Sequence, residues 1–259
     1  MSETNKQITP LHTLNPQNRF SDRVEDYVKY RPSYPAAAID RILENFTLPI
    51  AAADIGAGTG ISSRLLAARG IQVTAIEPNT EMRSAGIKDA TPSVEWKDGT
   101  AENTNLPDAS VDLVTCFQAF HWFTPEPTLA EFRRILKPQG RLAVVYNNRD
   151  KNDEFTAEYS RIVREASNNS PAEAKMKSTE PLTETAYFKK FEEYTFVYQQ
   201  ELDLTGLIGR AMSVSYLPKS GEDYDKLISD FEKLYQQFKN EQGFVYMTYF
   251  TSVHLGEVN

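Results

Sequence analysis

The sequence feature that most restricts the fold is a glycine-rich turn at residues 54–60, which reads Asp54-Ile-Gly-Ala-Gly-Thr-Gly60. An apolar run precedes the turn and residues at helical spacing follow it, so it joins a strand to a helix. Glycines allow the chain to turn sharply there and allow a ligand to approach the bare backbone. The turn therefore predicts a ligand site at the carboxyl edge of a sheet.

Strand and helix patterns alternate around this turn. The predicted strands are Pro49–Ile55, Gln72–Ile76, Val94–Trp96, Val111–Phe117 and Arg141–Tyr146. The predicted helices are Ala37–Asn45, Ile61–Arg69, Thr80–Lys88 and Thr128–Leu136. Such alternation is typical of an α/β fold with a doubly wound, mostly parallel sheet, helices on both faces and right-handed crossovers.

The two ends of the chain differ from this alternating part. Residues 1–35 predict an N-terminal arm, with a poorly ordered start and a helix from Phe20 that ends at the prolines 32 and 35. Residues 36–150 form the predicted core. We expect residues 151–259 to complete the sheet and to form a lid, with helices Glu154–Ala166 and Tyr224–Phe238, strands Phe196–Leu204 and Val245–Val253, and a mobile loop at Ser167–Glu180.

Composition excludes several partners. The formal net charge of −8 argues against binding to nucleic acid, which requires excess Lys and Arg. No apolar run reaches the length of a membrane span, and the polar N-terminus predicts no secretory signal. A single cysteine, Cys116, suits a reducing cytoplasm and a buried thiol. His12, His121 and His254 share no metal-ligand spacing, so we expect no metal. A monomer and a homodimer both stay open.

Two acidic residues near the turn indicate what it binds. The turn has the spacing G-x-G-x-G behind Asp54, whereas a dinucleotide fold has G-x-G-x-x-G. A carboxylate there suits an ammonium group and would repel a pyrophosphate. Glu77 follows the next strand, where an acidic side chain can accept both hydroxyls of a ribose. The alternatives are a purely structural turn and a solvated glutamate.

Five motifs then occur in an order that resembles the class I SAM-dependent methyltransferases. They are residues 54–60, Glu77-Pro78-Asn79, Gly99-Thr-Ala-Glu102 with Leu106-Pro107, Ser110–Val114, and Arg134–Gly140. The chain is most similar to the type 11 branch, which includes ubiquinone/menaquinone and trans-aconitate methyltransferases. The resemblance covers residues 20–150 well. It implies a Rossmann-like sheet of strand order 3-2-1-4-5-7-6, with the last strand antiparallel, and S-adenosylmethionine (SAM) as the cofactor.

The resemblance also implies roles for individual residues. The methionine part of SAM would lie on the turn, with Asp54 near its ammonium group, Glu77 on the ribose and Met82 beside the adenine. Many family members carry Asp where this chain has Thr100, so Asp98 or Glu102 would have to replace that adenine contact. The implied cofactor-binding residues are Tyr27, Arg31, Asp54, Gly56, Gly58, Thr59, Gly60, Glu77, Met82, Thr100, Ala101 and Gln118.

The residues that would bind the methyl acceptor are less clearly indicated. His121 is a candidate general base, and the alternative is that His121 and Trp122 form a packed wall over the cofactor. Arg31 could pair with a carboxylate of SAM or of an acidic acceptor, or it could be an ordinary surface arginine. Residues 206–216 mix small and polar residues in a way that favours a substrate wall over a plain core helix. The substrate candidates are Trp122, Arg210, Ser213 and Tyr216, with Tyr246 and Tyr249 from the final strand.

The sequence thus predicts a SAM-dependent methyltransferase that acts on a small molecule, either a carboxylic acid or a hydroxyl compound, and releases S-adenosylhomocysteine (SAH). Three alternatives remain. A catalytically silent regulator would bind SAM and transfer nothing. An NAD-dependent reductase would share the fold but not the glycine spacing. An RNA or protein methyltransferase would need a docking surface, which the acidic composition disfavours for RNA.

Overall fold

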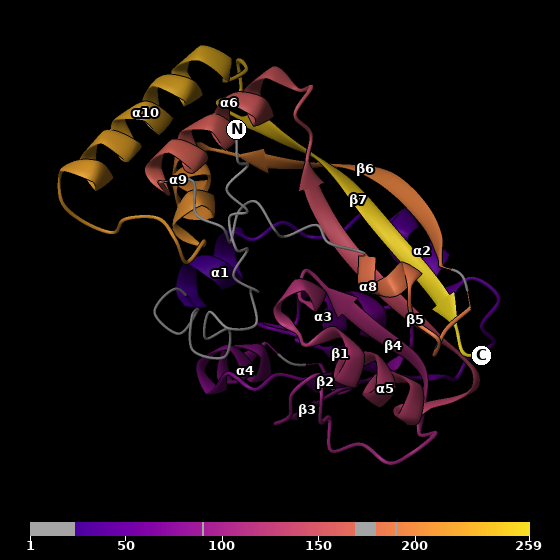
Figure 1. The fold of residues 1–259 in the computed structure, drawn as a ribbon. Helices are drawn as coiled ribbons and strands as arrows, with labels where there is room; N and C mark the ends of the chain where they lie inside the picture. The colour runs from indigo at the N-terminus through magenta and orange to yellow at the C-terminus, as the bar shows by residue number, and fades with distance from the viewer. Residues whose placement is uncertain (1–23, 90, 169–179, 190) are drawn as a thin grey trace, which may run out of the picture.

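The computed structural model describes residues 24–89, 91–168, 180–189 and 191–259 and contains one seven-stranded sheet (Figure 1). Its strand order is β3-β2-β1-β4-β5-β7-β6. The predicted fold class and strand order are therefore confirmed. The predicted residues 1–23 of the arm and most of the predicted loop at 167–180 lie outside the described residues.

The first five strands are parallel and place their carboxyl ends at one edge. They are β1 (Ala51–Ile55), β2 (Gln72–Ile76), β3 (Val94–Lys97), β4 (Val111–Phe117) and β5 (Leu136–Arg149). β7 (Val245–Glu257) is antiparallel to β5 and to β6 (Glu192–Leu202), between which it lies. The strand order reverses at β1 and β4, which are neighbours, so a crevice opens at their carboxyl ends.

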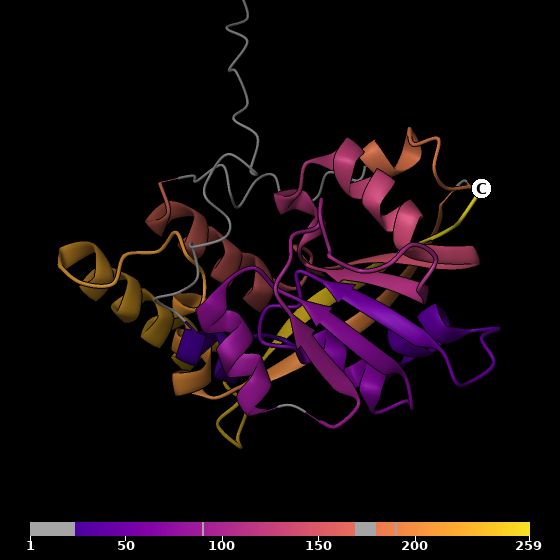
Figure 2. The ribbon, with the colours of Figure 1, turned by 90° about the horizontal axis from the view of Figure 1, so that it is seen from below.

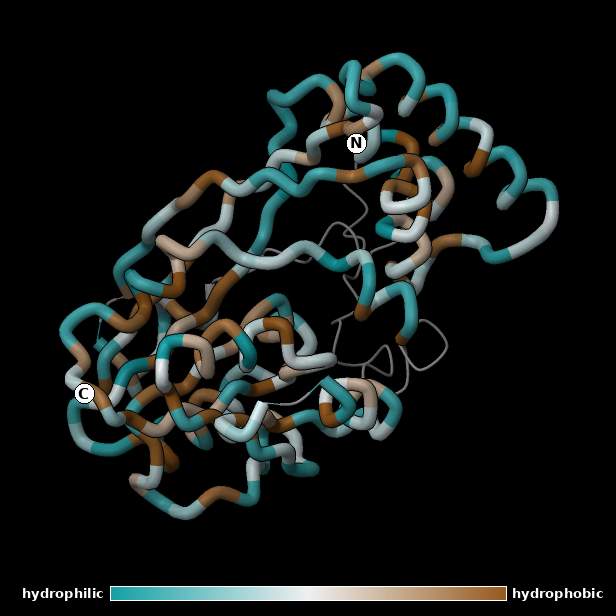
Figure 3. Tube along the Cα trace, turned by 180° about the vertical axis from the view of Figure 1, so that it is seen from behind, coloured by the Kyte–Doolittle hydropathy of each residue, from teal (hydrophilic) through white to brown (hydrophobic). Residues whose placement is uncertain are grey.

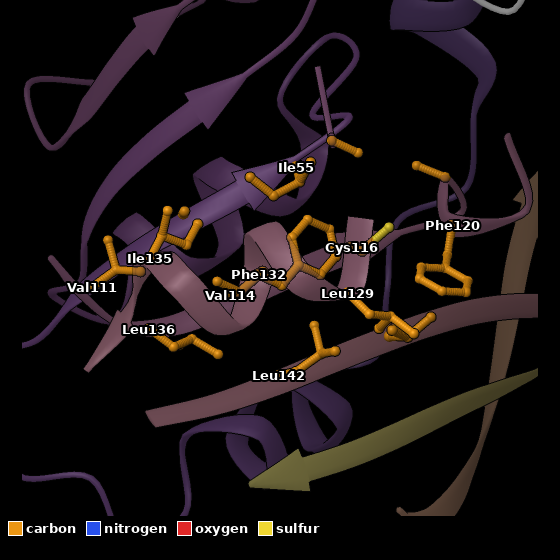
Figure 4. Packing of buried hydrophobic residues seen from close by; sticks show 14 of the residues in the cluster. Ile55, Val111, Val114, Cys116, Phe120, Leu129, Phe132, Ile135, Leu136 and Leu142 are labelled. Atoms are coloured by element: carbon orange, nitrogen blue, oxygen red, sulfur yellow. The ribbon is translucent and has the colours of Figure 1, made fainter. Parts of the chain in front are cut away.

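Helices cover both faces of the sheet (Figure 2). α2 (Ala36–Leu43) and α3 (Ile61–Ala67) bury apolar side chains on one face, with β1, β2 and β4. α5 (Pro125–Ile135) packs on the other face, where Figure 4 shows Phe132 among the side chains of Ile55 and Val114. Cys116 lies in this second cluster and is fully buried. α4 (Thr80–Lys88) follows β2.

A second lobe stands on the extended ends of β5, β6 and β7. α6 (Glu154–Ala166), α9 (Leu204–Met212) and α10 (Glu222–Phe238) share a separate apolar cluster with residues of β6 and β7. Figure 3 shows hydrophobic stretches concentrated in the half that holds the parallel strands, whereas α10 is mainly hydrophilic. The short helices α1 (Val24–Tyr30) and α8 (Glu180–Thr183) complete the described helices of four or more residues.

Several predicted boundaries were wrong. Within residues 206–216, for which a substrate wall was favoured over a plain core helix, α9 occupies 204–212, and Arg210 and Tyr216 line the cavity described below. β6 begins four residues before its predicted start, because alternating polar residues on an exposed edge strand carry a weak apolar signal. β5 begins at Leu136, where the sequence predicted the end of a helix. No helix in the described ranges has the length and apolarity needed to cross a bilayer.

Candidate functional site

A cavity of about 590 Å³ opens at the carboxyl ends of the parallel strands. It is lined by the glycine-rich turn, by the segments after β2, β3 and β4, and by the end of β5. Residues of α1, α6, β7 and α9, and of the segment after α9, complete the lining. The structure brings most of the predicted site residues together around it: Tyr27, Arg31, Gly56, Gly58, Glu77, Met82, Thr100, Ala101, Gln118, His121, Trp122, Arg210 and Tyr216. Asp54, Thr59, Gly60 and Ser213 do not line it.

The turn needs its glycines for different reasons. Gly56, Gly58 and Gly60 all have positive φ angles, of 68°, 59° and 80°, a region that side chains disfavour. A Cβ on Gly56 would lie 2.7 Å from the Cβ of Ala119, so the turn packs tightly against the segment after β4. A Cβ on Gly58 would meet nothing closer than 3.5 Å, which leaves its backbone open to the cavity.

Asp54 is enclosed beneath the turn. Its side chain is fully buried, and one carboxylate oxygen accepts hydrogen bonds of 2.6 Å from both Ser62 and Ser63. The other oxygen accepts one of 2.8 Å from Thr115 on β4. Burial raises the pKa of Asp54, and the three hydroxyl donors oppose that shift. Asp54 therefore ties the turn to α3 and β4, and the structure shows no access from its carboxylate to the cavity.

Glu77 does reach the cavity, with its carboxylate held by the backbone. Oε2 accepts the N–H of Gly58 at 2.8 Å, and Oε1 accepts the N–H of Asn79 at 2.9 Å. Burial raises the pKa of Glu77, whereas these two hydrogen bonds lower it. A carboxylate can accept more than one hydrogen bond per oxygen, so each oxygen keeps a lone pair for a ligand hydroxyl.

Residues 99–102, which follow β3, line the cavity together with Met82. Thr100 lines it, and its hydroxyl accepts the N–H of Asn103 at 3.2 Å. Asp98 does not line the cavity and pairs with Arg83 at 3.4 Å. Glu102 does line it, although its carboxylate already accepts the N–H of Thr124 at 2.9 Å. Of the two acids expected to replace the adenine contact, only Glu102 is therefore in position.

Gln118 begins the segment after β4, which contributes several residues to the cavity lining. Its φ of 53° is unusual for a residue with a side chain. Its N–H donates to the carbonyl of Val145 at 2.9 Å, and its amide donates to the carbonyl of Asn147 at 3.1 Å. Such strain persists only where surrounding contacts hold it, and it often accompanies a binding site.

His121 follows on this segment, half-buried and next to aromatic rings. Its ring lies 5.0 Å from that of Trp122 and 5.9 Å from that of Tyr146. Its Nδ1 is buried and has no hydrogen-bond partner among the described residues. Burial lowers the pKa of His121 to about 3, and the charge of Arg31 contributes. A neutral, weakly basic imidazole is poorly matched to taking a proton at neutral pH, which favours the packed wall over the general base.

Two arginines also line the cavity, the half-buried Arg31 and the buried Arg210. Arg31 donates from Nη2 to the carbonyl of Ser213 at 3.0 Å, and its guanidinium lies 4.5 Å from the ring centre of Tyr27. Its Nε is buried without a partner among the described residues. Arg210 donates from Nε to the hydroxyl of Tyr249 at 3.2 Å and from Nη1 to that of Ser213 at 3.3 Å.

Neither guanidinium pairs with a carboxylate in the part of the chain that the structure describes. Burial lowers the pKa of Arg31, and the charge of Arg210 lowers it further. A buried charge without a counterion costs several kcal/mol, so this wall is suited to an anionic ligand. The acids among the cavity residues are Glu77 and Glu102, and both already accept backbone N–H groups.

Sequence analysis missed part of the lining. Asn147 and Arg149 end β5, and Tyr159 and Val163 come from α6. The rule that ligands bind at the carboxyl ends of parallel strands could have indicated the first two. The α6 residues carry no such signal. Tyr249 lines the cavity as expected, whereas the exposed Tyr246 bonds to Glu201 at 2.8 Å and does not.

The described residues include no cluster of three or more His, Cys, Asp or Glu side chains that could hold a metal ion. The cavity instead combines a turn that exposes backbone, a fixed carboxylate, and two arginines of which Arg210 is buried and Arg31 half-buried. These groups suit an organic ligand with a ribose and at least one anionic group.

Comparison with known proteins shows that this chain is similar to methyltransferases. The family described as "Methyltransferase domain" matches residues 53–144. An uncharacterized methyltransferase-like protein of Schizosaccharomyces pombe is 31% identical over 207 residues, which cover 79% of this chain and 80% of that protein. An uncharacterized methyltransferase of Mycobacterium tuberculosis is 38% identical over 167 residues, and the match spans 63% of this chain and 65% of the relative's own length.

One shorter sequence match and one solved structure are also similar to this chain. A ubiquinone/menaquinone biosynthesis C-methyltransferase of Rubrivivax gelatinosus is 38% identical over 89 residues, which cover 34% of this chain and 36% of that protein. A putative type II methyltransferase structure from Anaeromyxobacter dehalogenans superposes with a TM-score of 0.68 at 21% identity, covering 88% of this chain and 98% of that one. By fold and by similarity along most of its length, this chain belongs to the class I SAM-dependent methyltransferases.

Proposed function

We propose that this protein transfers the methyl group of SAM to a small acid. The observation that carries the proposal is a pair of arginines, the buried Arg210 and the half-buried Arg31, that line the cavity without a carboxylate partner among the described residues. An acidic acceptor would offset the cost of burying this charge. The formal net charge of −8 makes such a cationic wall a local feature and not a reflection of overall composition.

The cavity residues fit the cofactor. The open backbone of Gly58 and the fixed carboxylate of Glu77 lie together, as the ribose and its neighbouring atoms require. Met82 and residues 99–102 would contact the adenine, and Gln118 would pass near the sulfur. Bound SAM would supply a methyl group on a sulfonium, whose sulfur leaves as a neutral thioether.

The protein's contribution is alignment. The reaction is an in-line displacement that needs no acid for the leaving group, so fixing the nucleophile, the methyl group and the sulfur in line provides most of the rate. A hydroxyl acceptor would need a base, and His121, with a pKa of about 3, is a poor one. A carboxylate needs no base. The site therefore favours the acid over the hydroxyl compound.

The test has two stages. Thermal unfolding with and without saturating SAH comes first, with NADH as the comparison for a reductase. SAH should raise the Tm and NADH should not, and an unchanged Tm with SAH would remove the cofactor assignment. Transfer of labelled methyl from SAM across a panel of carboxylic acids and their neutral amides follows. Transfer to acids supports the proposal, whereas transfer only to the amides refutes it, and SAH binding without transfer to any metabolite would indicate a silent regulator.

A further inference from the structure

We infer that Tyr146 is a positioning residue for His121: its hydroxyl holds the imidazole in the tautomer that carries the proton on Nε2. In that tautomer His121 offers the cavity a hydrogen-bond donor and no lone pair. The tautomer itself follows from contacts within this chain. Its consequence for the methyl acceptor rests on the proposed function, because it determines which acceptor atom can lie beside His121.

Tyr146 packs against His121 from outside the cavity. It lies on β5 in the apolar cluster that α5 covers, it is 2% exposed, and it does not line the cavity. His121 does line the cavity, and its ring centre lies 5.9 Å from that of Tyr146 with an angle of 36° between the ring planes. The imidazole therefore borders both the cavity and the phenol ring.

Each of the two rings carries a buried polar atom without a partner. The hydroxyl of Tyr146 and Nδ1 of His121 are both buried, and neither has a hydrogen-bond partner among the described residues. Buried polar atoms in folded proteins are hydrogen-bonded in the large majority of cases, because leaving one unsatisfied costs its full desolvation. Two such atoms on neighbouring rings are satisfied together when the hydroxyl donates toward Nδ1, with one buried water molecule between them.

The alternative tautomer satisfies fewer groups. With the proton on Nδ1, the imidazole would donate toward the phenol oxygen, and the hydrogen of the Tyr146 hydroxyl would be left without an acceptor. Burial raises the pKa of Tyr146, so the hydroxyl does keep its hydrogen. The other ring beside Tyr146 is that of His254, whose Nδ1 lies 4.0 Å from the carboxylate of Glu193. Nδ1 of His121 is therefore the acceptor that remains for Tyr146.

This tautomer determines what His121 can do in the cavity. A neutral imidazole carries one proton, so an accepting Nδ1 leaves that proton on Nε2. Since Nδ1 is the buried nitrogen of a ring that lines the cavity, Nε2 is the one that a ligand can reach. Its N–H suits a ligand oxygen with a lone pair and disfavours an ammonium group at the same place. His121 thus orients an acceptor oxygen and does not deprotonate it.

Nitrogen NMR of protein labelled in histidine reads the tautomer directly. The chain has three histidines, His12, His121 and His254, so His121→Gln and His254→Gln assign the signals. At neutral pH, wild type with and without SAH should show Nδ1 of His121 without a proton and Nε2 with one. Tyr146→Phe should move both shifts toward those of a free imidazole. Tyr34→Phe, which changes a buried tyrosine on the other face of the sheet, should leave both shifts unchanged.

A wild-type spectrum with the proton on Nδ1 would overturn the inference, and this result needs no variant to fold. Unchanged His121 shifts in a folded Tyr146→Phe protein would remove the role of Tyr146. Equal changes in Tyr146→Phe and Tyr34→Phe would also count against it, because they would show a general effect of packing.

Kinetics with any acid that accepts methyl would test the role of the donor. His121→Gln keeps an N–H donor and should retain the wild-type kcat with a KM close to that of wild type. His121→Phe removes the donor and should raise KM about tenfold with little change in kcat. A large fall in kcat for both variants at unchanged KM would indicate a general base and overturn the inference. No transfer by wild type to any acid would instead contradict the proposed function, while the spectra still decide the tautomer.

Discussion

Replacing Gly209 by alanine should push α1 away from the cavity. Gly209 lies on α9, and a Cβ there would lie 2.2 Å from Cδ2 and Cε2 of Tyr30 and 2.7 Å from its Cγ. Because even the ring atom nearest the backbone is too close, rotating the end of the side chain cannot relieve the contact. Ordinary van der Waals contact begins at 3.4 Å, so restoring it from 2.2 Å moves Tyr30 by about 1.2 Å.

A shift of that size breaks more than one contact. Arg31 follows Tyr30 directly, and its 3.0 Å hydrogen bond to Ser213 would not survive a lengthening by 1.2 Å. Alanine in place of a helical glycine adds about 1 kcal/mol of helix propensity, while overpacking costs roughly 1–3 kcal/mol. Unfolding free energy should therefore fall by no more than about 2 kcal/mol, whereas SAH affinity should fall about tenfold or more through Arg31.

Calorimetry with SAH and chemical denaturation would measure these two effects on wild type, Gly209→Ala, Tyr30→Ala and the double variant. The double variant removes the clash, so its SAH affinity should match that of Tyr30→Ala alone. Gly221→Ala is a useful control, since a Cβ there meets nothing within 4 Å, although its positive φ makes it mildly strained. Wild-type SAH affinity in Gly209→Ala would refute the claim that α1 docking on α9 completes the site.

Three other changes test separate parts of the site. Glu77→Gln leaves one of the two backbone N–H donors facing an amide nitrogen. SAH binding measured by calorimetry should therefore weaken by about 1.5–3 kcal/mol. An unchanged affinity would contradict the assignment of Glu77 to the ribose. The pKa of His121 lies near 3 in the folded protein, below its ordinary value of 6.5. Because the unfolded chain therefore binds the proton more readily, the free energy of unfolding should fall as the pH drops below about 6.5. His121→Gln should show a shallower decline with pH in denaturation curves. A Cβ on Gly86 would lie 2.1 Å from the Trp96 ring, so Gly86→Ala should cost about 1–3 kcal/mol of stability and lower the Tm by several degrees in scanning calorimetry.

Much of the site was predictable because parallel strands align their ends. Once strands at 51–55 and 72–76 are assigned, the turn after the first and Glu77 after the second must meet at one edge. The role of Asp54 could not be found in the same way. Its carboxylate is satisfied by hydroxyls of α3 and β4, and the Thr115 contact spans 61 positions of sequence, so only the folded structure reveals it.

The second lobe shows where local patterns fail. α9 contains Gly206 and Gly209, which lower helix propensity by about 1 kcal/mol each, so local propensity does not predict this helix. Tertiary packing reverses that preference, because the space left by Gly209 is filled by Tyr30. His121 is a comparable case: its type indicates a titrating base, while its buried setting keeps it neutral.

The long strands determine which parts of the protein can move. β5 runs without a break for 14 residues and β7 for 13, from the core into the second lobe, and their ladder is continuous from residues 141–149 to 249–257 (Figure 1). A hinge between the lobes would have to bend this paired ribbon and give up its hydrogen bonds. The distance between Arg210 in the second lobe and the glycine-rich turn in the core therefore changes only as far as these paired strands can bend. α1 buries no residue completely and is tied to the second lobe by side-chain contacts, such as the hydrogen bonds from Gln200 to the Tyr30 carbonyl and from Arg31 to the Ser213 carbonyl, so moving it would break fewer hydrogen bonds than bending the ribbon.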